Sequence, residues 1–282
     1  MKSLAKLKKI KGDASFREFY RNKQNKSIVV VSKKERLKNL LIYDAINKIL
    51  IKNKILAPNL LRENYINNYI EIKKLMGVSD QIAELNYNRF QSWKTPFTLE
   101  NAIPCGWAFS GAAYKGLDYG SLSNTIQEYS QGVLRILSGL YGVLKPLDLI
   151  QPYRLEMGTK MKNERGKDLY EFWGSTITSS VNELAKDNNS KAIVNLASVE
   201  YFSVLKKDKL NLPIINPVFK DYKNGKYKII SFFAKKARGS MTRFIVQNKI
   251  KTPRDLKDFD LDGYNYSESD SEENTPVFLR KN

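Results

Sequence analysis

Histidine is absent from this chain of 282 residues, and cysteine occurs once, as Cys105. Without histidine, the chain has no Ser-His-Asp or Cys-His catalytic arrangement and no histidine-ligated metal site. One cysteine cannot form an internal disulfide, a cysteine-rich zinc site or an iron–sulfur site within one chain. We therefore expect no cofactor and no metal held by these ligands, whereas a site made only of carboxylates could still hold Mg²⁺ or Mn²⁺.

Long apolar runs are also missing from the sequence. No stretch approaches the roughly 18–20 apolar residues that span a bilayer, so no membrane partner is expected. The first ten residues carry lysines, but they have neither the apolar core nor the cleavage site of a secretory signal. Together with the single cysteine, these features predict a cytoplasmic protein. Nothing in the sequence fixes the oligomeric state, and a monomer is favoured.

Positive charge is present in excess. The 48 Lys and Arg residues outnumber 29 Asp and Glu residues, which gives a formal net charge of +19 and a pI near 9.7. Such a field attracts polyanions. The abundance of Lys, Asn and Ile is also what AT-rich codon usage produces, so compositional drift on a solvated surface explains the same total. The placement of the charge therefore matters more than its sum.

The hydrophobic fraction of 42% supports a substantial core, and intermixed strand and helix patterns predict one α/β domain. Residues 1–26 are basic and nearly patternless, which predicts a mobile arm or a loosely attached helix. Strands are expected at 27–32, 107–114, 192–197, 214–219, 226–234 and 277–279. Helices are expected over 37–76, 80–93, 123–137 and 168–184, from Thr98, from Ser240 and from Thr252. Asn224-Gly225 predicts a β-hairpin, and residues 268–273 predict a loop.

The first candidate site lies around two glycines three residues apart, Gly139 and Gly142, within the block from Leu137 to Leu149. A turn of this kind between two helices exposes backbone N–H groups that hold phosphate, with Lys145 close to them. The alternative is a glycine-terminated helix followed by an ordinary loop. A little further on, Arg154 and Glu156 share one face of an extended segment, so we expect an ion pair at a cleft wall.

The second candidate site is a group of basic residues after a predicted strand, formed by Lys235, Lys236, Arg238 and Arg243. If Ser240 begins a helix, the positive end of that helix and these charges together predict an anion site. The alternative is a solvated basic edge.

Two further blocks carry candidate residues. Ser198 and Glu200 follow a predicted strand, a common ligand position in α/β sheets. Helix capping by Ser198 is preferred to catalysis, because a serine nucleophile would here need Lys or Glu as its base. Phe172 and Trp173 are expected in the core rather than as platforms for bases.

These blocks, taken in order, resemble the YaaA peroxide-stress family; the run LSGLYGVLKPLDLIQPYRLEMG and Phe97-Thr-Leu-Glu-Asn101 carry the resemblance. It extends from about Leu75 to the C-terminus, so we assign a family-like domain to 27–282 and a basic arm to 1–26. The resemblance implies a single compact α/β domain with a basic cleft and a helix-hairpin-helix element. It also implies cytosolic binding of double-stranded DNA and protection from iron-driven damage under peroxide stress. The candidates for the cleft are Gly139, Gly142, Lys145, Arg154, Lys235, Lys236, Arg238 and Arg243.

Two segments depart from the family pattern. Members usually begin with a strand leading into Ser-Pro-Ala-Lys-Thr, where this chain has Lys33-Lys-Glu-Arg36. They also tend to carry a Phe-Lys-Gly-Asp type of segment, where this chain has Phe109-Ser-Gly-Ala-Ala113. A functional pocket built on those family residues would be damaged here, whereas a DNA-binding surface could persist.

The leading interpretation is protective, sequence-independent binding of duplex DNA. The alternative is an enzyme that acts on a nucleotide or another phosphorylated molecule. In that alternative Arg154, Lys236 and Arg238 hold phosphate, and Glu156 or Glu200 is the acid or base. A third possibility is a partner-binding protein whose charge is mainly compositional.

Overall fold

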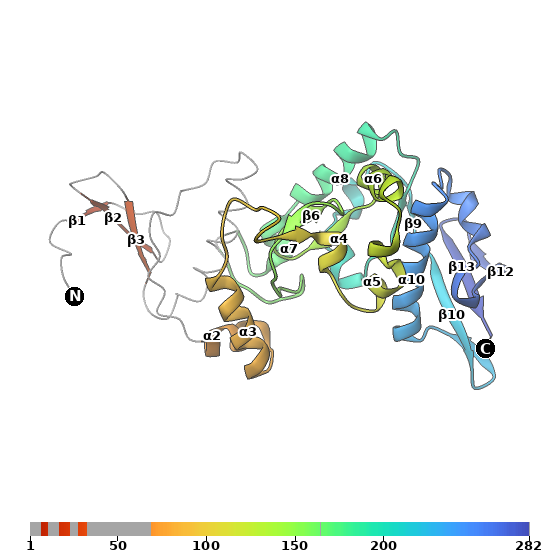
Figure 1. The fold of residues 1–282 in the computed structure, drawn as a ribbon, viewed down its shortest axis with the longest axis horizontal. Coiled ribbons are helices and arrows are strands. Elements are labelled where there is room, and N and C mark those ends of the chain that lie inside the picture. Colours follow the sequence, from red (N-terminus) through yellow and green to blue (C-terminus); the bar gives the residue numbers. More distant parts are fainter. Residues whose placement is uncertain (1–6, 11–16, 23–27, 33–68, 164, 282) are drawn as a thin grey trace. The chain divides into compact units, whose positions relative to one another are not determined.

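The computed structural model describes residues 7–10, 17–22, 28–32, 69–163 and 165–281 (Figure 1). The fold mixes helices and strands, as the α/β prediction requires. One compact unit comprises Met1–Trp93 and Thr159–Phe172, and the other comprises Lys94–Gly158 and Trp173–Asn282. All residues of the two candidate sites belong to the second unit. The extent of one family-like domain over 27–282 stays a prediction.

Three antiparallel strands in the first unit pair in chain order: β1 (Leu7–Ile10), β2 (Arg17–Asn22) and β3 (Ile28–Ser32). The strand predicted over 27–32 is thus confirmed. The helix alternative for the arm is wrong, because β1 and β2 pair with each other within it. Backbone hydrogen bonds between strands satisfy the donors and acceptors that a helix would have satisfied within itself.

Two helices follow in the first unit, α2 (Tyr69–Met76) and α3 (Asp80–Gln91). Helix α2 is the end of the helical region predicted over 37–76, and residues 33–68 lie outside the described residues. The backbone N–H of Ile82 donates to Ser79 Oγ at 3.4 Å, and so Ser79 caps α3. The helix predicted over 80–93 is confirmed.

The first half of the second unit alternates short strands with short helices: β4 (Ile103–Pro104), α4 (Cys105–Ala108), α5 (Ala112–Leu117), η3 (Tyr119–Ser121), α6 (Asn124–Val133), β5 (Ile136–Ser138), β6 (Gly142–Leu144) and β7 (Leu149–Ile150). Strand β4 pairs with β7 and β5 pairs with β6, both antiparallel. The strand predicted over 107–114 is wrong, because helices α4 and α5 occupy it. The helix predicted from Thr98 is a turn closed by the N–H groups of Asn101 and Ala102 on the Thr98 carbonyl.

Helix α7 (Leu169–Trp173) belongs to the first unit except for its last residue, Trp173, where the second unit resumes. The second unit continues with α8 (Thr176–Asp187), β8 (Ile193–Val194), α9 (Val199–Phe202), η4 (Lys207–Lys209) and β9 (Ile214–Ile215). The single helix predicted over 168–184 is two helices, because Gly174 between them has a left-handed φ of 53°. Phe172 and Trp173 are 7% and 8% exposed, which confirms their place in the core. Strands β8 and β9 pair in parallel.

A four-stranded sheet closes the second unit, in the order β11 (Lys226–Lys228), β10 (Val218–Lys223), β13 (Thr275–Arg280) and β12 (Asn265–Glu272). Strands β10 and β13 are parallel, and the other two pairs are antiparallel. The predicted hairpin is confirmed: Asn224 and Gly225 both have positive φ, 55° and 79°, which suits a two-residue turn between twisted strands. The loop predicted over 268–273 is largely strand β12.

Helix α10 (Ser231–Gln247) lies against this sheet (Figure 1). Ala237, Met241 and Phe244 share one face of the helix and are buried in a cluster with Phe219 and Phe278. Burial of each large apolar side chain contributes about 1.5–3 kcal/mol. The strand predicted over 226–234 ends at Lys228, and the helix predicted from Ser240 begins nine residues earlier, at Ser231. Helical spacing of the core residues thus overrides the strand-like run of Ile and Phe before them.

Two 3₁₀ helices, η5 (Pro253–Asp258) and η6 (Leu261–Gly263), connect α10 to β12. Thr252 precedes η5 and Pro253 is its first residue, so the short helix predicted from Thr252 is confirmed. In the part of the chain that the structure describes, no helix is long and apolar enough to cross a membrane.

Candidate nucleic-acid interface

Gly139 and Gly142 lie in the hairpin between strands β5 and β6, not between two helices. Helix α6 ends at Val133 because Leu134 has an extended backbone, with φ −91° and ψ 135°. Both interpretations of this segment that began with a helix, the helix-hairpin-helix element and the glycine-terminated helix, are therefore wrong at these residues.

The hairpin turn satisfies its own backbone groups. Ser138 Oγ accepts hydrogen bonds from the N–H groups of Leu140, at 3.2 Å, and Tyr141, at 2.8 Å. The hydroxyl of Ser138 also shares a 2.6 Å hydrogen bond with the hydroxyl of Tyr153. Two of the amides expected to hold phosphate are thus already paired within the fold.

Close packing favours glycine at both positions, and the left-handed backbone of Gly142, with φ 78°, favours it there as well. A Cβ at Gly139 would lie 2.5 Å from the carbonyl oxygen of Leu155, and a Cβ at Gly142 would lie 3.0 Å from the indole of Trp173. The indole N–H of Trp173 donates to the Gly139 carbonyl at 3.1 Å. The two glycines therefore serve the packing of Trp173 and of the segment around Leu155 against the hairpin.

Lys145 follows β6 with an exposed side chain. Its backbone is fixed by Cys105, whose thiol donates to the Lys145 carbonyl at 3.0 Å, and by Asp148, whose carboxylate accepts from the Lys145 N–H at 2.8 Å. No carboxylate within the described residues lies at ion-pair distance from the Lys145 ammonium. Its charge is thus available to a ligand.

Arg154 and Glu156 form the predicted ion pair, with Arg154 Nη2 2.6 Å from Glu156 Oε1. Both side chains are about half exposed. Glu200 lies in the same region and accepts a hydrogen bond from the Gly158 N–H at 2.9 Å. The guanidinium of Arg154 is therefore matched by the carboxylate of Glu156, which reduces its attraction for a polyanion.

Glu200 and Tyr201 belong to helix α9, and Tyr201 lies near Arg154 and Glu156. Ser198 caps the helix by accepting from the Tyr201 N–H at 3.3 Å, which confirms the capping interpretation. Burial raises the pKa of Tyr201 to about 12, and the negative charges of Glu200 and Glu156 act in the same direction. The phenol is therefore neutral at physiological pH and serves as a hydrogen-bonding group, not as a base.

A cluster of aromatic rings lies beside the hairpin, and sequence reasoning missed it. Phe109 stacks on Tyr114 at 5.3 Å between ring centroids, and Tyr153 meets Phe109 at 6.2 Å and Tyr141 at 5.2 Å edge to face. Burial raises the pKa of all three tyrosines above the ordinary value. Phe109 and Tyr114 are five residues apart, but Tyr141 and Tyr153 come from later segments, so local spacing does not indicate the whole cluster.

The basic residues of α10 differ in their exposure and in their hydrogen-bond partners. The side chain of Lys235 is exposed and has no carboxylate at ion-pair distance among the described residues. Arg238 donates to the Ala197 carbonyl at 2.7 Å, just before the start of α9. Arg243 donates to the carbonyls of Leu117 and Asp118, both at 3.0 Å. The two arginines thus tie α10 to neighbouring segments.

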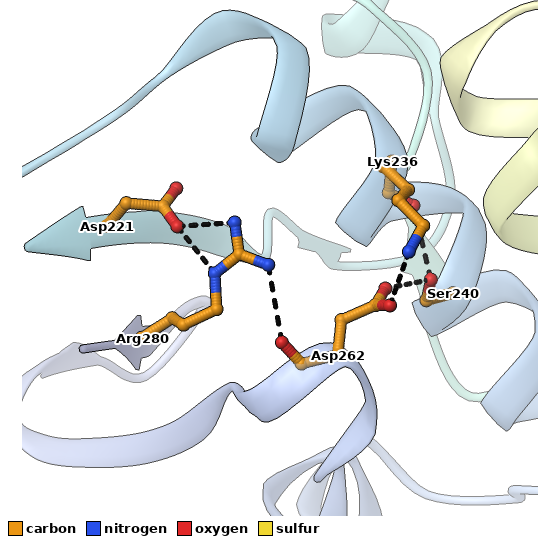
Figure 2. Close-up of polar contacts among 5 residues, drawn as sticks. All are labelled: Asp221, Lys236, Ser240, Asp262 and Arg280. Carbon is orange, nitrogen blue, oxygen red and sulfur yellow. Dashed lines mark hydrogen bonds and ion pairs between the residues drawn. The ribbon is translucent and has the colours of Figure 1, made fainter. Parts of the chain in front are cut away.

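Lys236 belongs to a polar network that Figure 2 shows. Its ammonium donates to Asp262 Oδ1 at 2.6 Å, and the hydroxyl of Ser240 donates to the other oxygen of the same carboxylate. Ser240 is 4% exposed and lies in the middle of α10, so its predicted role as a helix cap is wrong. The anion site expected at a helix start beside Ser240 is not formed there, since α10 has no N-terminus at that point.

Arg280 continues the network on the other side of η6 (Figure 2). Its guanidinium lies 2.6 Å from Asp221 Oδ1 and donates to the Asp262 carbonyl at 3.3 Å. The guanidinium also lies between two rings, 4.6 Å from the centroid of Phe233 and 4.5 Å from that of Tyr264. These contacts join β10, β13, η6 and α10, so the network holds the end of the sheet to the helix.

The three phosphate ligands of the enzyme alternative have partners within the fold, and that alternative stays a prediction. Lys236 is paired with Asp262, and Arg238 is held by a carbonyl oxygen and is partly buried. Arg154, the third, is neutralised by Glu156. Across the described residues, no group of three or more Cys, Asp and Glu side chains is placed to hold a metal ion.

Comparison with known proteins gives a consistent result. The sequence model of the family described as peroxide stress protein YaaA matches residues 52–270. A UPF0246 protein of Aliivibrio fischeri is 58% identical over 212 residues, which cover 75% of this chain and 82% of that protein. A UPF0246 protein of Polynucleobacter necessarius is 53% identical over 210 residues (74% and 81%), and one of Saccharophagus degradans is 55% identical over 211 residues (75% and 82%). The residues that the family model matches include every candidate site residue.

Proposed function

The chain belongs to the YaaA peroxide-stress family, and from that premise we propose that it binds double-stranded DNA without sequence preference and protects it during peroxide stress. The role in peroxide stress is inferred from the family, and DNA is inferred as the ligand from the net positive charge. One observation supports the choice of residues: Lys145 and Lys235 keep exposed ammonium groups with no carboxylate partner among the described residues, in a chain of net charge +19.

Contacts within the fold support a smaller set of candidate DNA contacts. Lys236, Arg238 and Arg243 have partners inside the fold, and Arg154 is matched by Glu156, so we assign the phosphate contacts to Lys145 and Lys235 first. Contacts of lysine to phosphate neutralise charge and release counterions, and they give affinity without reading the sequence. A cleft that holds both lysines, and the cytoplasmic location, are parts of the same proposal.

The proposal is tested by measuring duplex binding over a range of salt concentrations. We expect the logarithm of the affinity to fall linearly with the logarithm of salt concentration, with a slope of roughly −0.9 for each phosphate neutralised. The double variant Lys145→Glu/Lys235→Glu should bind two unrelated duplexes more weakly by the same factor. Its slope should be smaller by roughly 0.9 for each phosphate that the variant no longer neutralises.

The matched control is Lys186→Glu/Lys251→Glu, which changes the net charge by the same amount through two other exposed lysines. It should weaken binding much less than the test variant. Equal reductions of affinity in the two variants would show that only total charge matters, and salt-independent or absent duplex binding would refute the proposal altogether.

A further inference from the structure

The hairpin formed by β10 and β11 carries an exposed pair of aromatic rings. Tyr222 and Tyr227 are directly opposite each other in the register, and their ring centroids lie 5.2 Å apart at an interplanar angle of 68°. They are 40% and 38% exposed, and Ile229, two residues after Tyr227, is 62% exposed. Strand β13 pairs with β10 only as far as Asp221, so the hairpin extends beyond the sheet (Figure 1). Tyr222 and Tyr227 lie in this extension.

Lysines are numerous in this hairpin. Lys223 and Lys226 are directly opposite each other next to the turn, and Lys228 follows Tyr227. Because side chains alternate along a strand, these three lysines point to the face of the hairpin opposite to the rings. Among the described residues no carboxylate lies at ion-pair distance from these three ammonium groups. The ammonium of Lys281 lies 4.9 Å from the ring centroid of Tyr222. Three cations of the hairpin and one that follows β13 thus lie near two exposed rings.

Without a ligand, this arrangement of lysines lowers the stability of the hairpin. Like charges directly opposite each other on neighbouring strands destabilise the pair, and Lys223 and Lys226 stand in that relation. Among the described residues, the acidic residues of β12 form no ion pair with these lysines. Asp270, the one that reaches β10, lies 3.5 Å from the ammonium of Lys220 instead. Binding of an anion between these lysines would remove the repulsion.

Aromatic rings among unpaired lysines are the combination that binds single-stranded nucleic acid. Bases stack on the rings, and the lysines neutralise the phosphates between them. Duplex DNA keeps its bases stacked inside the double helix. It would therefore contact the lysines, but its bases would not stack on the rings. Lysines on an edge strand also prevent pairing with other chains, but that role does not need Tyr222 and Tyr227.

We propose that the β10–β11 hairpin is a binding platform for single-stranded nucleic acid. Unpaired bases stack on Tyr222 and Tyr227, Lys281 contacts a phosphate on the face of the rings, and Lys223 and Lys226 contact phosphates where the bound strand passes over the turn. Lys281 occupies the position over Tyr222 that a base takes on binding, and it then moves to a phosphate. Stacking accepts every base, so the platform has little sequence preference. It uses neither of the residues to which the duplex contacts are assigned, Lys145 and Lys235.

The test uses the full chain and a labelled oligo(dT) of about 12 nucleotides, with an oligo(rU) of the same length. Fluorescence anisotropy measures its affinity for the native chain, for Tyr222→Ala/Tyr227→Ala and for Tyr222→Phe/Tyr227→Phe. Removal of both rings should lower the affinity for the single strand about tenfold or more. The phenylalanine variant should bind like the native chain, because it keeps the stacking surfaces. Binding of both oligonucleotides supports the proposal, since stacking does not depend on the sugar.

A second experiment tests the lysines. It compares the variant Lys223→Gln/Lys226→Gln with the matched variant Lys186→Gln/Lys251→Gln. The hairpin pair should reduce the salt slope by roughly 0.7 for each phosphate that is no longer neutralised, and the matched pair should leave it unchanged. Thermal unfolding of each variant confirms that the chain is folded. Duplex affinity is measured on the same variants and should change by less than about twofold on removal of the rings, so failure of the duplex proposal is seen independently.

Three results would overturn the proposal. The first is an unchanged single-strand affinity in the folded alanine variant. The second is an equal reduction of duplex and single-strand affinity, which would mean general electrostatic attraction. The third is capture of a protein through this hairpin without measurable binding of either oligonucleotide.

Discussion

At Gly239 the backbone of α10 touches the backbone of α5. A Cβ at this position would lie 1.7 Å from the Ala113 carbonyl oxygen, and a Cβ at Gly116 would lie 2.2 Å from the Lys236 carbonyl oxygen. Real Cβ atoms do not approach so closely, and the obstacles are main-chain atoms that cannot rotate away. The crossing of the two helices therefore depends on two residues without side chains.

We predict that Gly239→Ala destabilises the chain by about 3 kcal/mol or more, since the helices must separate to admit one methyl group. The greater helix propensity of alanine offsets only about 1 kcal/mol of this. Gly120→Ala is the control, because a Cβ there has nothing within 4 Å. Urea unfolding followed by circular dichroism measures both; an equally small effect at the two sites would contradict the packing argument.

Cys105 is the one thiol of a protein in a peroxide-stress family, yet its environment suppresses its reactivity. It is fully buried, and its thiol donates to the carbonyls of Lys145 and Pro146. Burial, with the negative charge of Asp148, raises its pKa from 9.0 to about 12. The thiolate is the species that peroxide oxidises. The structure therefore gives Cys105 a packing role and not that of a peroxide sensor.

We predict that iodoacetamide alkylates Cys105 very slowly in the native chain at about pH 8, and rapidly after denaturation in urea. Mass spectrometry counts the added groups at each time. Hydrogen peroxide should leave the native thiol unmodified under the conditions that oxidise the unfolded chain. Rapid native alkylation would show that the segment around Cys105 opens readily.

At the scale of elements, the contact of η6 with α10 depends on Asp262. Burial alone would raise the pKa of this carboxyl, but hydrogen bonds from Lys236 and Ser240 and the charges of Lys236 and Arg280 outweigh it and lower the pKa. A carboxyl whose folded pKa is lowered stabilises the fold above its unfolded value. That contribution is lost as the pH falls through the folded pKa.

We predict that Asp262→Asn lowers the free energy of unfolding by about 1–3 kcal/mol at about pH 7, and that the difference from the native chain shrinks below pH 3.8. Asparagine suits the left-handed backbone at this position, where φ is 57°, so the change tests the charge. Asp208→Asn, at an exposed site in η4, is the control and should have no effect at either pH. A difference that is the same at every pH would refute the role of ionisation.

Elements that are determined by residues close together in the sequence could be predicted from it. Asn224-Gly225 indicated its hairpin and Ser198 indicated its helix cap, because the hydrogen bonds and backbone angles concerned are local. The start of α10 could not be predicted in this way. Residues 226–234 have the composition of a strand, and only the packing of Met241 and Phe244 on the sheet decides for a helix.

The residues of the candidate site also divide into those with partners nearby in the sequence and those with distant partners. The ion pair of Arg154 with Glu156 was predictable, because two residues of extended chain place the side chains on one face. The partners of Lys236, Arg238 and Arg243 lie 26, 41 and 125 residues away along the chain, so no spacing indicates them. A count of basic residues therefore overstates the number that are available to a ligand.

At the scale of the whole molecule, the net charge of +19 was known from composition, but its distribution was not. In the C-terminal sheet the unpaired lysines lie on the β10–β11 hairpin, and the acidic stretch 268–273 lies along and just beyond β12, at the opposite edge. The two edges of one sheet thus carry opposite charge. A polyanion that meets this sheet is drawn to one edge and repelled by the other, which orients the encounter.

The position of β13 between β10 and β12 also sets an order of events during synthesis. Asp221 on β10 emerges from the ribosome long before its cation, Arg280, which follows 59 residues later. Until β13 is made, neither β10 nor β12 has its central neighbour, and Phe219 lacks the ring of Phe278. A nascent chain that pauses before Thr275 therefore exposes an open strand edge and an unfinished core, which are the features that chaperones bind and that other chains pair with.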